Sequence, residues 1–249
     1  MKIGLKMYSN KKDLEFISGI KDQIDFIELL VIHDFNETDE VVKRLIDIGL
    51  PVQIHIANSN HGINLANRKK HETNRLAMEK AIHVADMLGS EVIVVHPNDS
   101  NDDEIDVGYF LDFIKGFDDA RIHIENLRFT PHSISSTIDD LAYLIENTGY
   151  SFCFDFEHCI VSYFAHVQET DYISFCRDYI TKLKPKYFHI SDGRLGNIKD
   201  IHLRIGKGEF DIKSMVRLIP ENSSIVIETP HDEHQIEDIR WIKDATHYK

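Results

Sequence analysis

Histidine and carboxylate side chains recur at the ends of six short apolar segments of this chain. The segments are QIHIAN at 53–58, VVHPN at 94–98, HIENL at 123–127, FDFEHC at 154–159, FHISD at 188–192 and IVIETP at 225–230. A seventh segment, KDIHLRIGKGEFD at 199–211, adds Asp200 and His202. Imidazole and carboxylate groups together bind zinc, manganese, iron or cobalt, whereas structural zinc sites usually contain thiolates. The segments therefore predict a metal site that can carry chemistry.

The prediction of a metal site rests on how many of these residues occur together. A lone histidine at a strand end is usually a hydrogen-bonded polar residue, and a lone glutamate is usually a cap or an ion-pair partner. Here six candidates each fall at the end of a different predicted strand, namely His55, His96, Glu125, Asp155, His189 and Glu228. So many buried polar and charged groups at one place would be costly without a cation to pair with them.

Strand-like and helix-like patterns alternate along the sequence. Period-two spacing predicts strands at 2–7, 26–31, 51–56, 92–95, 122–124, 152–154, 187–190 and 225–227. Period-3.6 spacing predicts helices at 11–21, 37–48, 68–88, 107–117, 137–146, 171–183, 212–219 and 233–242. Eight such units in 249 residues favour one closed (β/α)8 TIM barrel spanning residues 1–249. In such a barrel the C-terminal strand ends form the mouth where chemistry takes place.

Charge and composition limit the function further. The formal net charge of −14 argues against indiscriminate binding of nucleic acid. No apolar run approaches the roughly 18 to 20 residues of a membrane span, and the start MKIGLKMY lacks the features of a signal peptide. Three cysteines cannot form a disulfide framework, so a cytoplasmic protein without a membrane segment is expected. The oligomeric state stays open.

The motifs resemble those of the endonuclease IV family (AP endonuclease family 2). That family belongs to the xylose isomerase-like TIM barrels, which also include sugar epimerases and isomerases. The resemblance covers about residues 51–230 and rests on His55, HPN at 96–98, EN at 125–126, Asp155-x-x-His158, FHISD, Asp200-x-His202 and ETP at 228–230. It implies a DNA-repair hydrolase that cleaves phosphodiester bonds, with abasic DNA as one candidate substrate.

The resemblance also implies a ligand set for up to three zinc ions, with manganese as a substitute. Nine residues form three groups: His55, His96 and Glu125; Glu125 with Asp155, His189 and Glu228; and His158, Asp200 and His202. Glu125 would bridge two ions and orient the attacking water, so no separate general base is required. Cations in this arrangement polarise a phosphodiester, activate water and stabilise the leaving oxygen.

Two alternatives remain open. A sugar or sugar-phosphate isomerase or epimerase of the same superfamily would hold one ion with Glu125, Asp155, His189 and Glu228. Glu125 and Glu228 would then be catalytic, as acid and base on opposite sides of a ketose. A barrel that binds metal and ligand without turnover is the other alternative. The one-ion set does not include His55, His96, Asp200 and His202, and their presence favours a three-ion site. A count of bound metal ions per chain distinguishes the hydrolase from the isomerase.

The contacts with duplex DNA are where the sequence departs from the resemblance. Endonucleases of the family place an aromatic-plus-leucine wedge after the third-strand histidine. Here the loop IANSNHGINLAN at 56–67 has no aromatic residue, and His61 and Ile63 are poor substitutes. The loop VIHDFNE at 31–37 lacks a basic residue. A small phosphodiester or an exposed single-stranded site is therefore the better predicted substrate, and Lys6 is predicted to point inward, where it can meet a phosphate.

Overall fold

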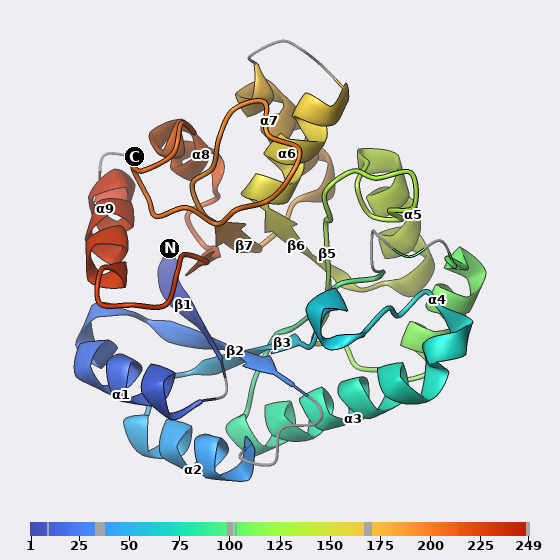
Figure 1. The fold of residues 1–249 in the computed structure, drawn as a ribbon, viewed down its shortest axis with the longest axis horizontal. Helices are drawn as coiled ribbons and strands as arrows, with labels where there is room; N and C mark the ends of the chain where they lie inside the picture. The colour runs from blue at the N-terminus through green and yellow to red at the C-terminus, as the bar shows by residue number, and fades with distance from the viewer. Residues whose placement is uncertain (9, 33–37, 99–101, 103, 167–170, 248–249) are drawn as a thin grey trace.

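Eight parallel strands form a closed barrel in the part of the computed structural model that is described, which comprises residues 1–8, 10–32, 38–98, 102, 104–166 and 171–247 (Figure 1). The strands follow one another around the barrel in chain order, and β8 closes onto β1. They are β1 (Lys2–Tyr8), β2 (Phe26–Val31), β3 (Val52–Ile56), β4 (Ile93–Val95), β5 (Ile122–Glu125), β6 (Ser151–Asp155), β7 (Tyr187–Ile190) and β8 (Ser224–Ile227). The predicted TIM barrel is confirmed.

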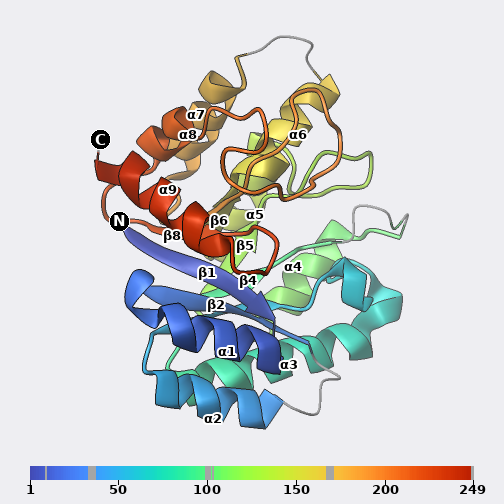
Figure 2. The same cartoon turned by 60° about the vertical axis from the view of Figure 1, so that its left-hand side comes forward.

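Helices surround the barrel on its outer side (Figures 1 and 2). They are α1 (Lys11–Ile20), α2 (Thr38–Ile48), α3 (His71–Leu88), α4 (Val107–Lys115), α5 (Ile138–Thr148), α6 (Phe156–His166), α7 (Tyr172–Leu183), α8 (Ile212–Leu218) and α9 (Gln235–His247). Glu37, predicted to begin the second helix, lies outside the described residues. Within the described ranges, no helix is both long enough and apolar enough to cross a membrane.

Helix α6 was not predicted from the sequence. It begins directly after β6, and its first eight residues, 156–163, are all buried. A helix buried on every side has no polar face, so the period-3.6 contrast that reveals a helix is missing. Phe156, directly after the last residue of β6, is the first residue of this helix. The consequence for the site is that His158 projects from a helical turn.

Apolar side chains close the barrel beneath its mouth. A separate buried cluster contains Phe26, Val94, Cys153, Tyr187 and Val226. Each of them lies two residues before a polar residue of the mouth, which is in the same strand or directly after its end, and therefore on the same, inward face. We call this cluster the barrel floor. It separates the polar mouth from the other end of the barrel.

Candidate metal centre

All nine predicted ligands lie together at the C-terminal mouth of the barrel. They border or lie beneath a cavity of about 560 Å³, whose lining also includes Lys6, Tyr8 and Asn58. His96, Asp200 and His202 are half-buried and the other six are buried: His55, Glu125, Asp155, His158, His189 and Glu228. Glu125 and Glu228, the two predicted catalytic carboxylates, therefore lie at the same end of the sheet.

The first group has two imidazoles facing one carboxylate oxygen. Nε2 of His55 lies 3.2 Å from Oε2 of Glu125, and Nε2 of His96 lies 3.1 Å from the same oxygen. The other ring nitrogen of His55, Nδ1, donates a hydrogen bond to the carbonyl oxygen of Ile56 at 2.7 Å. That bond fixes the ring so that Nε2 points to the cavity, and the three ligand atoms can hold one metal ion.

In the third group two imidazoles again face one carboxylate oxygen, that of Asp200. Oδ2 of this carboxylate lies 3.6 Å from Nε2 of His158 and 3.3 Å from Nε2 of His202. Each Nδ1 is held by a backbone carbonyl oxygen, that of Asn126 for His158 at 2.8 Å and that of Glu228 for His202 at 3.1 Å. Both Nε2 atoms thus face the one carboxylate, and the group can hold a metal ion.

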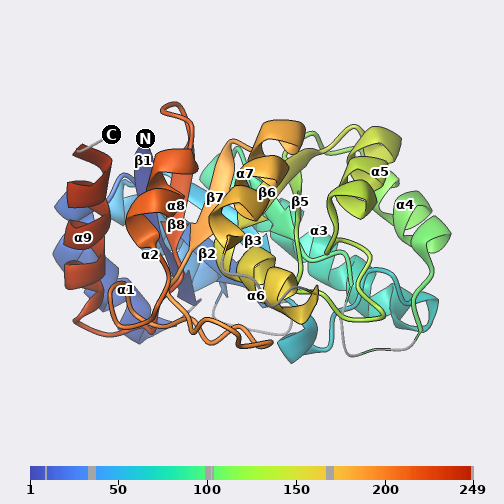
Figure 3. The same cartoon turned by 90° about the horizontal axis from the view of Figure 1, so that it is seen from above.

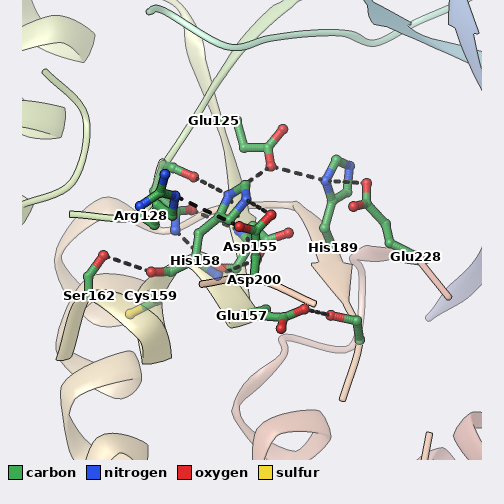
Figure 4. Close-up of polar contacts among 12 residues, drawn as sticks. Glu125, Arg128, Asp155, Glu157, His158, Cys159, Ser162, His189, Asp200 and Glu228 are labelled. Carbon is green, nitrogen blue, oxygen red and sulfur yellow. Dashed lines mark hydrogen bonds and ion pairs between the residues drawn. The ribbon is translucent and has the colours of Figure 1, made fainter. Parts of the chain in front are cut away.

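His189 lies between Glu125 and Glu228 in the middle of the site (Figure 4). Its Nδ1 is 3.4 Å from Oε1 of Glu125 and 2.9 Å from Oε1 of Glu228. Nδ1 is nevertheless buried without a hydrogen bond of acceptable geometry. A buried polar atom without a partner is costly, and a cation bound to Nδ1 and the two carboxylates would remove that cost.

Glu28 is a buried site residue that the sequence did not reveal. Its Oε2 accepts a hydrogen bond from Nε2 of His189 at 2.9 Å, and its Oε1 lies 3.5 Å from Nζ of Lys6. Lys6 points inward, as predicted, and also binds Glu228 at 2.5 Å. Glu28 sits in the middle of β2 instead of at its end, so a search of strand ends passes over it. The signal in the sequence is a glutamate inside the otherwise apolar strand FIELLV.

Four imidazoles therefore have one ring nitrogen fixed by an oxygen acceptor: those of His55, His158, His189 and His202. Metal-binding histidines in proteins are held in this way by a carboxylate or carbonyl group. Cys153 also comes within reach of Glu125 and His189, and burial raises the pKa of its thiol, so the thiol stays protonated when no cation is bound. The donors present fit a divalent cation of the zinc type.

When no cation is bound, protonated imidazole groups neutralise the negative charge of the carboxylates. Burial favours the neutral form of His202, but its hydrogen bond with Asp200 and the negative charges of Glu228 and Asp155 raise its pKa to about 9. Hydrogen bonds from His158 and His202 lower the pKa of Asp200. Burial, together with the charge of Glu125, raises the pKa of Asp155 to about 6. A metal ion bound here would displace protons from the imidazoles.

Two more buried carboxylates hold the long loop between β7 and α8, which follows the edge of the mouth near the start of α6 (Figures 1 and 3). Asp192 accepts hydrogen bonds from the backbone N–H groups of Gly206, Gly208 and Phe210. Glu157, on α6, accepts hydrogen bonds from Ser191 and from the backbone of the ligand segment 200–202. Sequence analysis missed both roles because the partners are distant in the chain.

The loop after β3 offers no wedge. Ile63 is only 2% exposed, and His61 belongs to a short 3-10 helix, Ser59–His61. Most of the other loop in question, residues 33–37, lies outside the described part of the chain. The aromatic rings at the cavity come from elsewhere: Tyr8 is 45% exposed, and its ring centre lies 4.6 Å from that of His231.

Comparison with known proteins agrees with this architecture. The model of the family described as xylose isomerase-like TIM barrels matches residues 21–245. "Probable endonuclease 4" of Mycobacterium bovis is 25% identical over 205 residues, which cover 79% of this chain and 77% of that relative. The crystal structure of endonuclease IV from Thermus thermophilus matches with a TM-score of 0.76 and 16% identity, covering 100% of both chains. A D-tagatose 3-epimerase-like protein matches with a TM-score of 0.75 and 18% identity, over 100% of this chain and 98% of that one. At these identities the two solved structures support the fold alone.

Proposed function

This chain belongs to the xylose isomerase-like TIM-barrel family, and on that premise we propose that it is a metal-dependent phosphodiester hydrolase. The observation that carries the proposal is the convergence of three groups of nitrogen and oxygen donors on one mouth. The first two groups share Glu125, and the third adds His158, Asp200 and His202. The similarity to proteins named endonuclease 4 supports the same interpretation.

The proposal assigns each group one ion, with zinc as the expected metal and manganese as a substitute. Glu125 would be a ligand of both the first and the second ion, because its Oε2 faces His55 and His96 whereas its Oε1 faces His189. Glu228 completes the second group beside His189, and Asp155, which lies within reach of Glu125 and His158, is assigned to it as the fourth ligand. When bound, the ions supply positive charge that polarises a phosphodiester and favours attack by water on phosphorus.

The protein's own side chains would bind the substrate, orient the attacking water and neutralise negative charge. Lys6 and Arg128 place positive charge at the mouth, the latter 3.8 Å from Asp200 through its Nε atom. In the reaction the oxygen of water bonds to phosphorus, one ester P–O bond breaks, and the leaving oxygen takes up a proton. Glu125 orients the water. The barrel floor keeps water out of the barrel below the reacting atoms.

The contact between Lys6 and Glu228 disfavours the isomerase alternative. An isomerase would use Glu228 to transfer a proton at a carbon next to a carbonyl group. Here the Lys6 ammonium group lies 2.5 Å from Oε1 of Glu228. Although burial opposes the charged form, His189 and Lys6 hold the pKa of that carboxyl well below its usual range. A carboxylate held in this way is a weak base.

The proposal includes a substrate preference and a compartment. A net charge of −14 and a β3 loop without a wedge favour a small phosphodiester or single-stranded DNA with an abasic site over an intact duplex. The three cysteines are free and buried, which supports a reducing cytoplasm as the compartment.

Two measurements test this function. Elemental analysis of protein purified without chelator should give three zinc ions per chain. With zinc or manganese supplied, a single-stranded abasic oligonucleotide should be cleaved faster than the same lesion in a duplex. Strong preference for the duplex would show that another surface binds DNA. One ion per chain with ketose isomerisation, and no cleavage of either oligonucleotide, would replace the hydrolase by an isomerase.

We expect Glu28→Gln to weaken binding of the ion at His189. The amide has one acceptor oxygen where Nε2 of His189 and Nζ of Lys6 face two, so its NH2 group must face one of these donors and the hydrogen bond that fixes the ring is weakened. Loss of such a partner typically costs about 10- to 100-fold in metal affinity. Competition with a chromophoric chelator measures this affinity. Lys6→Met is the matched variant, because it removes the ammonium group and keeps the Glu28–His189 bond; equal weakening in both variants would contradict the proposed role of Glu28.

A further inference from the structure

Glu157 is a buried carboxylate that lies next to the third ligand group without belonging to it. It stands in the first turn of α6, directly before His158, and is 1% exposed. Its Oε1 accepts a hydrogen bond from the backbone N–H of Ile201 at 2.7 Å. Its Oε2 accepts one from the backbone N–H of His202 at 3.0 Å and one from the hydroxyl of Ser191 at 2.5 Å. One side chain thus ties α6 to the segment that carries Asp200 and His202.

The backbone that Glu157 holds is a conformation that few residues adopt. His202 has φ of +46°, in the left-handed region that disfavours side chains other than glycine. Such a conformation is strained and persists only where its surroundings enforce it. The two hydrogen bonds from Ile201 and His202 to Glu157 enforce it here. In this conformation Nε2 of His202 faces Asp200 and Nδ1 binds the Glu228 carbonyl.

Close packing around Glu157 leaves the loop little room to shift. A Cβ atom on Gly193 would lie 3.0 Å from Oε1 of Glu157 and 2.4 Å from the ring of Phe210. An antiparallel bridge between Asp192 and Leu203 follows directly after His202. Two carboxylates therefore fix the loop between β7 and α8. Asp192 binds the backbone of Gly206 and Gly208, and Glu157 binds the backbone of the segment that carries Asp200 and His202.

We propose that Glu157 is a positioning residue that sets the metal affinity of the His158–Asp200–His202 group while leaving the other two groups unchanged. This inference rests on the proposed three-ion site, and it concerns metal binding before any substrate is present. Hydrogen bonds from backbone N–H groups to a buried carboxylate are charge-assisted and stronger than neutral ones. Without them His202 can leave its left-handed conformation, and its ring then turns away from Asp200.

The test is Glu157→Gln, because the amide keeps the size of the side chain but presents an NH2 group where two acceptors are needed. The matched control is Glu209→Gln, on the same loop. Oε2 of Glu209 also accepts a backbone N–H, that of Leu195 at 3.1 Å, but Glu209 is exposed and pairs with Arg194 instead of the ligand segment. Zinc content after gel filtration, and competition with a chromophoric chelator, are measured for both variants and wild type.

We expect three ions in wild type and Glu209→Gln but two in Glu157→Gln, with the affinity of the weakest site lowered about 10- to 100-fold. Asp200→Asn should lose the same ion, and combining it with Glu157→Gln should remove no further ion. Three ions with unchanged affinity in Glu157→Gln would overturn the inference, and so would loss of the ion bound by His55, His96 and Glu125.

If Glu157→Gln does not fold, Glu157→Asp provides the test, because it keeps the charge but shortens the side chain, so that the carboxylate no longer reaches both backbone N–H groups of Ile201 and His202. Weakening of the third ion alone supports the inference, and unchanged affinity of all three ions overturns it. Failure of the proposed function has a different signature. A wild-type protein with three ions but no hydrolysis contradicts the function and leaves Glu157 testable, whereas fewer than three ions in wild type contradicts both.

Discussion

Glu125→Gln is expected to lose two of three metal ions and nearly all hydrolytic activity. Both oxygens of Glu125 are used: Oε2 faces His55 and His96, and Oε1 lies 3.4 Å from Nδ1 of His189. An amide offers one oxygen acceptor and an NH2 group that repels a cation, so neither ion keeps its full ligand set. Loss of a group that merely orients a ligand already costs about 10- to 100-fold in affinity or activity. Loss of the bridging ligand should therefore lower the rate by more than about a hundredfold.

Elemental analysis and initial rates on an abasic oligonucleotide measure the two effects of Glu125→Gln. Glu146→Gln is a suitable control, because Glu146 is an exposed residue on the outer helix α5. The ion at His158, Asp200 and His202 should remain bound in Glu125→Gln. Unchanged stoichiometry in that variant would contradict the bridging role, and loss of a single ion would assign Glu125 to one group.

Removing the metal is expected to lower the melting temperature by about 8 °C or more. A ligand at a thousand times its dissociation constant stabilises the folded state by about 4 kcal/mol, if it binds the folded state alone. For chains of this length, each kcal/mol shifts the melting temperature by about 2–4 °C. The stabilisation of even one tightly bound ion is therefore measurable, and three ions increase it. The reason lies at the metal site, because without cations the negative charge of the buried carboxylates is neutralised only by protonated imidazoles.

Thermal unfolding at fixed protein concentration, with and without a chelator, measures this difference. Zinc added back should restore the melting temperature, whereas calcium should not, because calcium prefers oxygen ligands and this site is rich in imidazole nitrogen. A melting temperature that is the same with chelator and with zinc would contradict a metal site formed by these residues.

The sequence predicted the barrel and the meeting place of the ligands because both follow from local patterns. Alternation of strands and helices identifies the fold, and the side chain at each strand end must face the shared mouth. Glu28 and Glu157 were missed because their roles depend on partners far along the chain, His189 for Glu28 and His202 for Glu157. Glu157 was hidden further by α6, whose uniformly buried first eight residues remove the helical pattern.

The barrel floor has a consequence for the order of events at this site. Phe26, Val94, Cys153, Tyr187 and Val226 fill the inward face below the ligands, so the mouth is the one route for ions and substrate through the described barrel. A substrate seated in the cavity then covers the exit of the ions beneath it. In the proposed three-ion site, metal loading would have to precede substrate capture, and a cell short of zinc would hold a pool of folded barrels without metal until the supply returns.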